Sequence, residues 1–253
     1  MSGERIRIGT CVLGGLAISL VSGSALAQDS GETISMFEAF FIQKDQRTGS
    51  IEWLGTIVVW LLLMMSMSTF ALLALFHRET RRKHIVPRAS VVRLRKALKE
   101  EGPVAMEDVA ATCDSTMCLA LRAALREQDA GHDAMVRALE QACDELTAAR
   151  LRRVEVLHII GSVSPMIGLF GTVYGMILAF QEIVASGGTP DPVGLAAGIG
   201  TALTTTFWGL VVAIPALAGH AFLRNGIDAL TAEAALEAED LVNHFRPKDE
   251  SAG

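Results

Sequence analysis

The sequence predicts an all-α membrane protein in which three transmembrane helices carry a helical domain that extends into the cytoplasm. Composition is the first observation: 51% of the 253 residues are hydrophobic and only 20% are charged, which is too apolar for an ordinary soluble domain. The second is that residues 53–76, 156–181 and 192–223 contain no Asp, Glu, Lys or Arg. At about 1.5 Å per residue, each stretch can cross a hydrocarbon core of about 30 Å as a helix, and only helices satisfy their own backbone groups there.

Charge and motifs exclude other function classes. The formal net charge is −6, so no general basic field exists to attract nucleic acid. The sequence contains no nucleotide-binding loop, metal-ligand spacing or nucleophilic triad. We therefore expect no enzyme activity, no catalytic residue, no metal and no cofactor.

The first 27 residues have the organisation of a signal peptide. Arg5 and Arg7 precede an apolar run over residues 8–21, and small residues follow up to Ala27, which predicts cleavage after Ala27. An uncleaved signal anchor stays open as the alternative, although the run is short for a membrane span. In either case, residues 28–50 form a periplasmic segment ahead of the first transmembrane helix, residues 51–76.

Basic residues predict the orientation of the spans. Lys and Arg are frequent over residues 78–99, directly after the first span, whereas the link between the second and third spans contains Asp191 and no Lys or Arg. Basic loops stay in the cytoplasm, and the same basic run also suits contact with anionic lipid. The remaining segments are therefore a cytoplasmic helical domain (residues 77–155), the second transmembrane helix (156–185), a periplasmic turn (186–192), the third transmembrane helix (193–223) and a cytoplasmic C-terminal tail (224–253).

The predicted cytoplasmic parts are helical. Gly102-Pro103 and Gly131 are strong breakers between residues 77 and 155, so helices should run on either side of them. From Asp133 an apolar stripe leads without a breaker toward the second span, which predicts one long helix, and the tail has the pattern of an amphipathic helix packed on its neighbours. Because thiols stay reduced in the cytoplasm, three cysteines are expected as small, reduced residues of the helical core: Cys113, Cys118 and Cys143.

Hydroxyl side chains are concentrated in the second and third spans. Thr172 lies in the middle of the second span, and four threonines occupy about one and a half turns of the third: Thr201, Thr204, Thr205 and Thr206. These four divide between two faces of the helix, which suits a subunit that packs on one side and borders a lumen on the other. For any single threonine, the alternative is a hydrogen bond to its own helix backbone. We expect no carboxylate within any span.

Small residues indicate close helix packing. In the second span, Gly168, Gly171 and Gly175 recur at three and four residues, a spacing that lets helix backbones approach in a membrane. They lack the Lys-Ser/Thr that follows the glycines of a phosphate-binding loop. On the third span, Gly209 and Pro215 are the corresponding packing residues.

Two stretches resemble the MotA/TolQ/ExbB family of proton-channel subunits. Residues 161–176 are similar to the second span of ExbB and TolQ proteins, with the hexapeptide Gly-Leu-Phe-Gly-Thr-Val at residues 168–173. Residues 198–216 are similar to the third span. The resemblance covers about residues 53–223 and is weak in the predicted cytoplasmic domain.

The resemblance implies a pentamer in the bacterial inner membrane, with its N-terminus periplasmic and its C-terminus cytoplasmic. The second and third helices would line a pore that holds single-span ExbD- or TolR-like partners. Thr172 and Thr206 match the two pore threonines of the family, and Thr201 and Thr205 are further candidates for the proton pathway. At Thr201 many ExbB and TolQ proteins carry a glutamate, so this subunit is not expected to supply a mid-membrane proton carrier.

The implied function is a subunit of a motor, driven by the proton-motive force, that energises outer-membrane transport or envelope processes. Membrane lipids and a TonB-like protein are further partners that this function allows. Two alternatives stay open. One is a relative of the flagellar stator subunit MotA, which normally has four spans, and the other is a non-conducting, oligomeric membrane scaffold.

Overall fold

The computed structural model describes residues 53–100, 102–189 and 191–246. The predicted signal peptide, residues 1–27, and the predicted periplasmic segment, residues 28–50, lie outside the described residues. Throughout these three described ranges the regular secondary structure is helical, with no strand. The predicted all-α fold class is confirmed.

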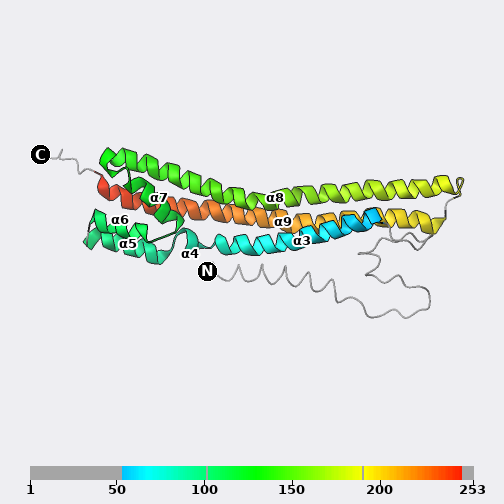
Figure 1. Ribbon diagram of the computed structural model, residues 1–253, viewed down its shortest axis with the longest axis horizontal. Coiled ribbons are helices and arrows are strands. Elements are labelled where there is room, and N and C mark those ends of the chain that lie inside the picture. Colours follow the sequence, from blue (N-terminus) through cyan, green and yellow to red (C-terminus); the bar gives the residue numbers. More distant parts are fainter. Residues whose placement is uncertain (1–52, 101, 190, 247–253) are drawn as a thin grey trace, which may run out of the picture. The chain divides into compact units, whose positions relative to one another are not determined.

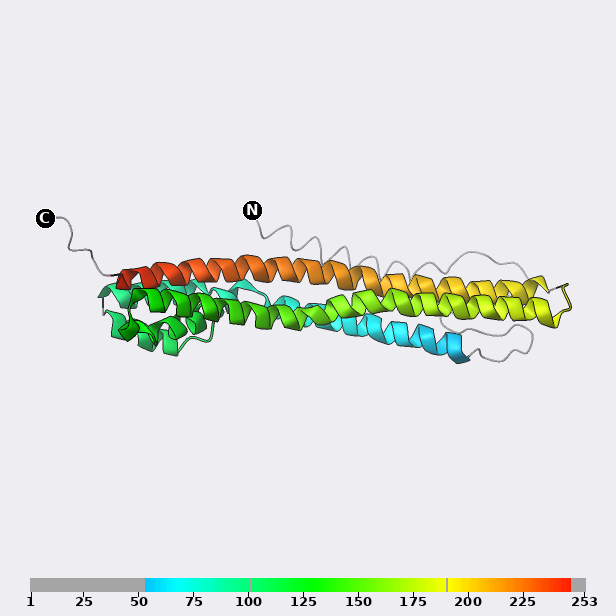
Figure 2. The same cartoon turned by 90° about the horizontal axis from the view of Figure 1, so that it is seen from above.

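Three of the helices are long and apolar enough to cross a membrane. They are α3 (Trp53–Glu79), α8 (His132–Ala185) and α9 (Pro192–Val242). In both views α8 and α9 run side by side, and α3 lies along their apolar parts (Figure 1, Figure 2). The three charge-free stretches therefore form helices that can span a bilayer, as predicted.

The turn between α8 and α9 is short and well capped. Gly187 and Gly188 have φ angles of 66° and 95°, a conformation that glycine adopts without steric cost. The Asp191 side chain then accepts a hydrogen bond from the backbone N–H of Val193 at 3.4 Å, and Pro192 occupies the first turn of α9, where its missing N–H is not needed. The chain thus reverses within a few residues, and α8 and α9 run antiparallel.

Both α8 and α9 continue past their apolar stretches as single helices. The long helix predicted from Asp133 into the second span is confirmed, because α8 begins at His132. The predicted tail helix is a continuation of the third span: α9 is unbroken to Val242 and ends in the 3-10 turn η2, Asn243–Phe245. Residues 228–242 contain no glycine or proline, so no residue in this part interrupts the helix.

Short helices gather at the ends of α8 and α9 that lie away from the turn (Figure 1). As predicted, Gly102-Pro103 and Gly131 separate helices, and both glycines have positive φ angles, of 89° and 96°. We call these helices, with the parts of α8 and α9 that pack on them, the short-helix domain. Its own elements are α4 (Arg82–Ile85), α5 (Arg88–Glu100), α6 (Pro103–Ala111), α7 (Thr116–Leu125) and the 3-10 turn η1 (Gln128–Ala130).

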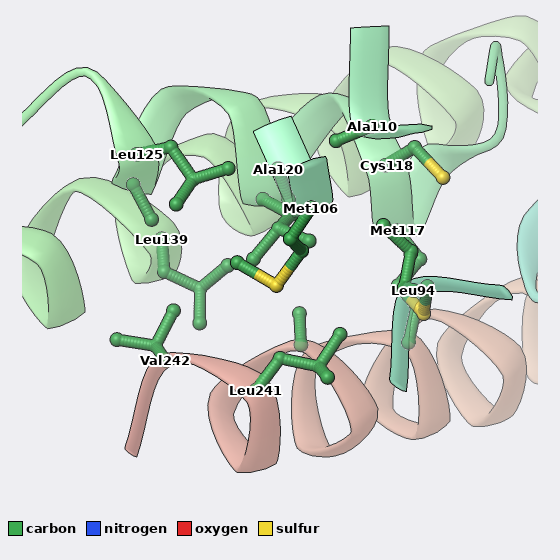
Figure 3. Close-up of a cluster of buried hydrophobic side chains, with 14 of the residues drawn as sticks. Leu94, Met106, Ala110, Met117, Cys118, Ala120, Leu125, Leu139, Leu241 and Val242 are labelled. Atoms are coloured by element: carbon green, nitrogen blue, oxygen red, sulfur yellow. The ribbon is translucent and has the colours of Figure 1, made fainter. Parts of the chain in front are cut away.

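The short-helix domain is built on a hydrophobic core that joins five helices. Leu94, Met106 and Met117 come from α5, α6 and α7, and they meet Leu139 of α8 and Leu241 of α9 (Figure 3). All five side chains are at most 2% exposed. Burial of these side chains fixes the ends of the two long helices relative to each other.

Replacement of Leu241 by alanine should destabilise this core. Loss of a fully buried leucine side chain commonly costs about 2–5 kcal/mol, and Leu241 is 0% exposed. Leu236 is the matched control on the same helix, because it is 68% exposed. We expect Leu241→Ala to lower the thermal midpoint of the purified protein in detergent and Leu236→Ala to leave it unchanged. Equal effects of the two changes would contradict this description of the core.

The cysteines depart from the prediction at one place. Cys118 is buried in α7, but Cys113 lies in the link between α6 and α7, and its sulfur is bonded to that of Cys118. The expectation of reduced helical thiols is therefore wrong for this pair. The cause is a chain break that was not predicted: Ser115 caps α7 by accepting a hydrogen bond from the N–H of Cys118 at 3.3 Å. This turn brings the two cysteine Cα atoms to 5.9 Å, within disulfide range.

Cys143 is a free thiol, half-buried in α8, as predicted for a small residue of the helical core. Burial raises the pKa of this thiol, and the neighbouring carboxylate of Asp144 adds to the effect. The thiolate is the reactive form, so Cys143 has low reactivity near neutral pH.

Basic residues that follow α3 pair with the acidic end of α9. Arg82 pairs with Glu233, and Arg95 lies 2.9 Å from Glu237 and 3.0 Å from Asp240. These side chains are all partly exposed, so each pair contributes little to stability. Arg82 and Arg95 belong to the basic run that was expected to set the topology and to contact lipid. These two arginines thus also join the short helices to α9.

Candidate functional site

The two long helices α8 and α9 approach each other through small residues. A methyl group added at Gly175 would lie 2.6 Å from the backbone nitrogen of Ala202 and 2.6 Å from the carbonyl oxygen of Gly198. No side chain fits at such distances, so the backbones are in contact. We call this interface the α8–α9 seam; its small residues are Gly168, Gly171, Gly175 and Ala179 of α8 and Gly198, Ala202 and Gly209 of α9.

The threonines of α9 divide between the seam and the flanks of the helix. Thr201 and Thr205 are buried, and the side chain of Thr205 occupies the space left by the missing side chain of Gly171. Thr204 and Thr206 are half-buried. Thr201 and Thr205, which were predicted to belong to the proton pathway, therefore lie inside the packed interface between two helices of one chain.

Thr172 and Thr206 lie at the same level of the two helices. Their sequence neighbours Gly171 and Thr205 are in contact across the seam, and both threonine side chains are half-buried. The structure thus places both threonines at the edge of the glycine-rich part of the seam.

Four of these hydroxyls are bonded to their own helices. Thr201, Thr205 and Thr206 donate to the carbonyl four residues back, at 3.1, 3.0 and 3.2 Å, and Thr172 donates to the carbonyl of Leu169 at 2.7 Å. The backbone bonding considered as the alternative is therefore present. A hydroxyl oxygen has two lone pairs besides its single donor, so each oxygen keeps the capacity to accept a hydrogen bond.

Pro165 and Pro215 lie inside α8 and α9. A proline has no N–H, so the carbonyl groups of Gly161 and Val211, four residues earlier, lack their usual helix donor. Both carbonyl groups lie between the threonine level and the short-helix domain. They add two acceptors to otherwise apolar parts of the helices.

The second span contains a carboxylate that was not predicted. Because α8 runs on to Ala185, Glu182 lies in its last turn, and the expectation of carboxylate-free spans is wrong there. The Glu182 side chain lies against α9, where a methyl group added at Gly194 would be 2.9 Å from its Cδ. About 15 Å of helix separates Glu182 from Thr172, so this carboxylate lies at the turn and not at the threonine level. The available signal was its position in the sequence, because Glu182 lies within the predicted second span, residues 156–185.

Helix α3 packs on α8 and α9 over their apolar parts. Val58 and Leu62 of α3 are buried against Val212 of α9, with Trp208 beside them. Elsewhere on α8 and α9, large apolar side chains stay exposed, as on a surface that faces lipid or other subunits. They include Met166, Leu169, Phe170, Leu203, Phe207 and Ile214.

The fold and the seam together define a class of protein: a membrane protein with three long apolar helices, two of them joined by a glycine- and threonine-rich interface. The model of the MotA/TolQ/ExbB proton channel family matches residues 111–235, which contain that interface. Over this segment the chain belongs to the MotA/TolQ/ExbB family and is ExbB/TolQ-like. The family expected from the two motifs is confirmed.

Three relatives illustrate the similarity. The biopolymer transport protein exbB1 of Vibrio cholerae is 44% identical over 70 residues, which are 28% of this chain and 31% of the relative. The biopolymer transport protein ExbB of Helicobacter pylori is 35% identical over 94 residues, 36% of this chain and 64% of the relative. The Tol-Pal system protein TolQ of Haemophilus influenzae is 38% identical over 96 residues, 38% of this chain and 41% of the relative. The match to the Vibrio protein thus spans about a third of that relative's length.

Proposed function

We propose that this chain is an ExbB/TolQ-like subunit of a proton-driven complex in the bacterial inner membrane. With an ExbD/TolR-like single-span partner, the complex energises outer-membrane transport or envelope processes. One observation carries the proposal: the α8–α9 seam holds small residues and half-buried hydroxyls at one level of two long apolar helices, within a segment that matches a proton-channel family. The relatives' names, a biopolymer transport protein and a Tol-Pal system protein, support the process.

In the proposed complex, copies of this subunit form a ring, a pentamer as the resemblance implies. Exposed apolar side chains such as Phe170 and Phe207 support burial against lipid or sister subunits. Thr172 and Thr206 border the pore, and Thr201 and Thr205 support them from the seam. Hydroxyls do not titrate near pH 7, so an aspartate on the partner's helix is the proton carrier. A unit charge that crosses 100 mV releases about 2.3 kcal/mol, so mechanical work requires repeated transfers.

The proposed orientation places the turn over residues 186–192 in the periplasm and the short-helix domain in the cytoplasm. The basic run of the short-helix domain supports it, because such runs are retained in the cytoplasm. The N-terminus of the first span is then periplasmic, and the C-terminus is cytoplasmic.

Cysteine labelling tests this orientation. In a variant without native cysteines, Thr189→Cys at the exposed turn should react with a membrane-impermeant maleimide added to spheroplasts. Ala89→Cys, exposed on α5 within the basic run, should react only after the inner membrane is permeabilised. The reverse pattern would contradict the orientation and the pore geometry that depends on it.

Proton flux into vesicles tests the function. We expect vesicles that contain this subunit alone to conduct no more than empty vesicles, and vesicles that contain the subunit with an ExbD/TolR-like partner to conduct protons. A substitution of the partner's membrane aspartate by asparagine should abolish the flux. Robust flux from the subunit alone would remove the partner from the pathway. A complex without flux would instead favour the non-conducting scaffold.

A further inference from the structure

Titratable side chains meet at the end of the seam nearest the short-helix domain. His220 of α9 is buried, with 8% of its surface exposed, and its Nε2 lies 3.4 Å from Oε2 of Glu155 on α8. His158, one turn along α8 from Glu155, has its ring centroid 5.2 Å from that of His220. Two imidazoles and a carboxylate, contributed by two helices, therefore lie together where the apolar part of the seam ends.

This cluster connects the interior of the helix pair to its surface. His220 is the buried member, the Glu155 side chain is 52% exposed, and His158 is exposed. A proton on His220 can therefore reach water through Glu155 without crossing further protein.

The charged side chains on the neighbouring elements are either paired elsewhere or exposed to solvent. Against this part of α9, Leu73 of α3 lies at Gly219, and Thr80, directly after α3, lies at Gly226. The acidic residue at the end of α3, Glu79, lies 3.6 Å from Arg153 of α8 and is paired with it. On α9 itself, Arg224 follows His220 by one turn and is exposed to solvent.

Polar groups also lie between the threonines and this cluster. Ser164 of α8 is fully buried beside Gly209, and within the described ranges its hydroxyl has no hydrogen-bond partner. A buried hydroxyl is normally satisfied, by water where no protein group is available. Ser164 lies about 12 Å along the helix from Thr172 and about 14 Å from Glu155, and the Gly161 carbonyl freed by Pro165 lies between Ser164 and the cluster.

We propose that His220, Glu155 and His158 form the cytoplasmic proton-release site of this subunit. The assignment rests on the proposed proton-conducting function and orientation. The imidazole of His220 accepts a proton that arrives from the threonine level and passes it to the Glu155 carboxylate, which releases it to water. Each cycle moves one proton and returns both groups to their starting forms. Imidazole suits this step because it gains and loses a proton in the range of cytoplasmic pH. His158, exposed beside the pair, offers a second acceptor.

Flux through the whole complex tests the site. Vesicles that hold the subunit with its ExbD/TolR-like partner are driven by a constant proton-motive force while the pH on the cytoplasmic face is varied. We expect wild-type flux to fall as that pH is lowered, because a release site that already holds a proton cannot accept the next one. His220→Gln should lower the flux at neutral pH about tenfold and remove the pH dependence. His84→Gln, at an exposed histidine of α4, is the matched control and should behave as wild type.

The outcomes separate the inference from the function on which it rests. Wild-type flux and an unchanged pH profile in His220→Gln would overturn the release site and leave the proposed function standing. A wild-type complex without flux would overturn both. If His220→Gln fails to assemble, as judged by size-exclusion chromatography, the double variant Glu155→Gln/His158→Gln replaces it, because both of its side chains are solvent-accessible. A wild-type profile in that double variant would also overturn the release site.

Discussion

Gly175→Ala is expected to force α8 and α9 apart and to abolish the native-size complex. The added methyl group would lie 2.6 Å from two backbone atoms of α9, the nitrogen of Ala202 and the oxygen of Gly198. Backbone atoms cannot rotate away as a flexible side chain can, so the whole helix must move. Overpacking of this kind commonly costs about 1–3 kcal/mol, and a displaced α9 also carries Thr206 away from Thr172. Gly175→Leu should act in the same direction and more strongly.

The matched control is Gly200→Ala on α9. A methyl group added at Gly200 has no other atom within 4 Å apart from its local helix neighbours, and alanine favours a helix over glycine by about 1 kcal/mol. Gly200→Ala should therefore keep or raise the thermal midpoint, whereas Gly175→Ala should lower it and shift the size-exclusion profile. Because the seam lies within one chain, the loss should already be visible in the stability of the subunit alone. A Gly175→Ala protein with native stability and size would show that the seam is not packed as described.

The long helices could be predicted because their signals are local. Charge-free stretches indicate a membrane span by their length and composition alone. The absence of a breaker between Asp133 and the second span is enough to predict one continuous helix. The seam residues could be identified for the same reason, since glycines at three- and four-residue spacing mark a face of one helix. Which helix that face would meet required the structure, which places it against α9 of the same chain.

The polar residues were harder to predict because their roles depend on contacts between distant segments. Helical periodicity divides the α9 threonines between two faces, but only packing against α8 shows that Thr201 and Thr205 are buried and that Thr206 lies at the edge. The pairing of Glu155 with His220 joins residues on two helices whose register the sequence does not specify. Glu182 was missed because the expectation of carboxylate-free spans rested on the charge-free stretch, residues 156–181, although the predicted second span, residues 156–185, already contains it.

Thr172→Val is expected to reduce proton flux through the complex while leaving assembly intact. Valine keeps the branched shape of threonine, so the half-buried position beside the seam stays filled. The change removes the hydroxyl that donates to the Leu169 carbonyl at 2.7 Å, and with it the lone pairs that can orient water next to the carboxyl group of the proposed partner. We expect flux in vesicles with the partner to fall about tenfold, which corresponds to about 1.4 kcal/mol in the barrier.

Thr147→Val is the matched control for this prediction. Thr147 lies on the same helix and donates to the carbonyl of Cys143 at 2.7 Å, so its replacement removes a comparable intrahelical hydrogen bond away from the seam. If loss of such a bond were the cause of reduced flux, both variants would be impaired, with lowered thermal midpoints. A selective loss in Thr172→Val, at native complex size, places the hydroxyl in the proton pathway. Wild-type flux in Thr172→Val would remove this residue from the pathway and leave Thr206 as the remaining half-buried pore threonine.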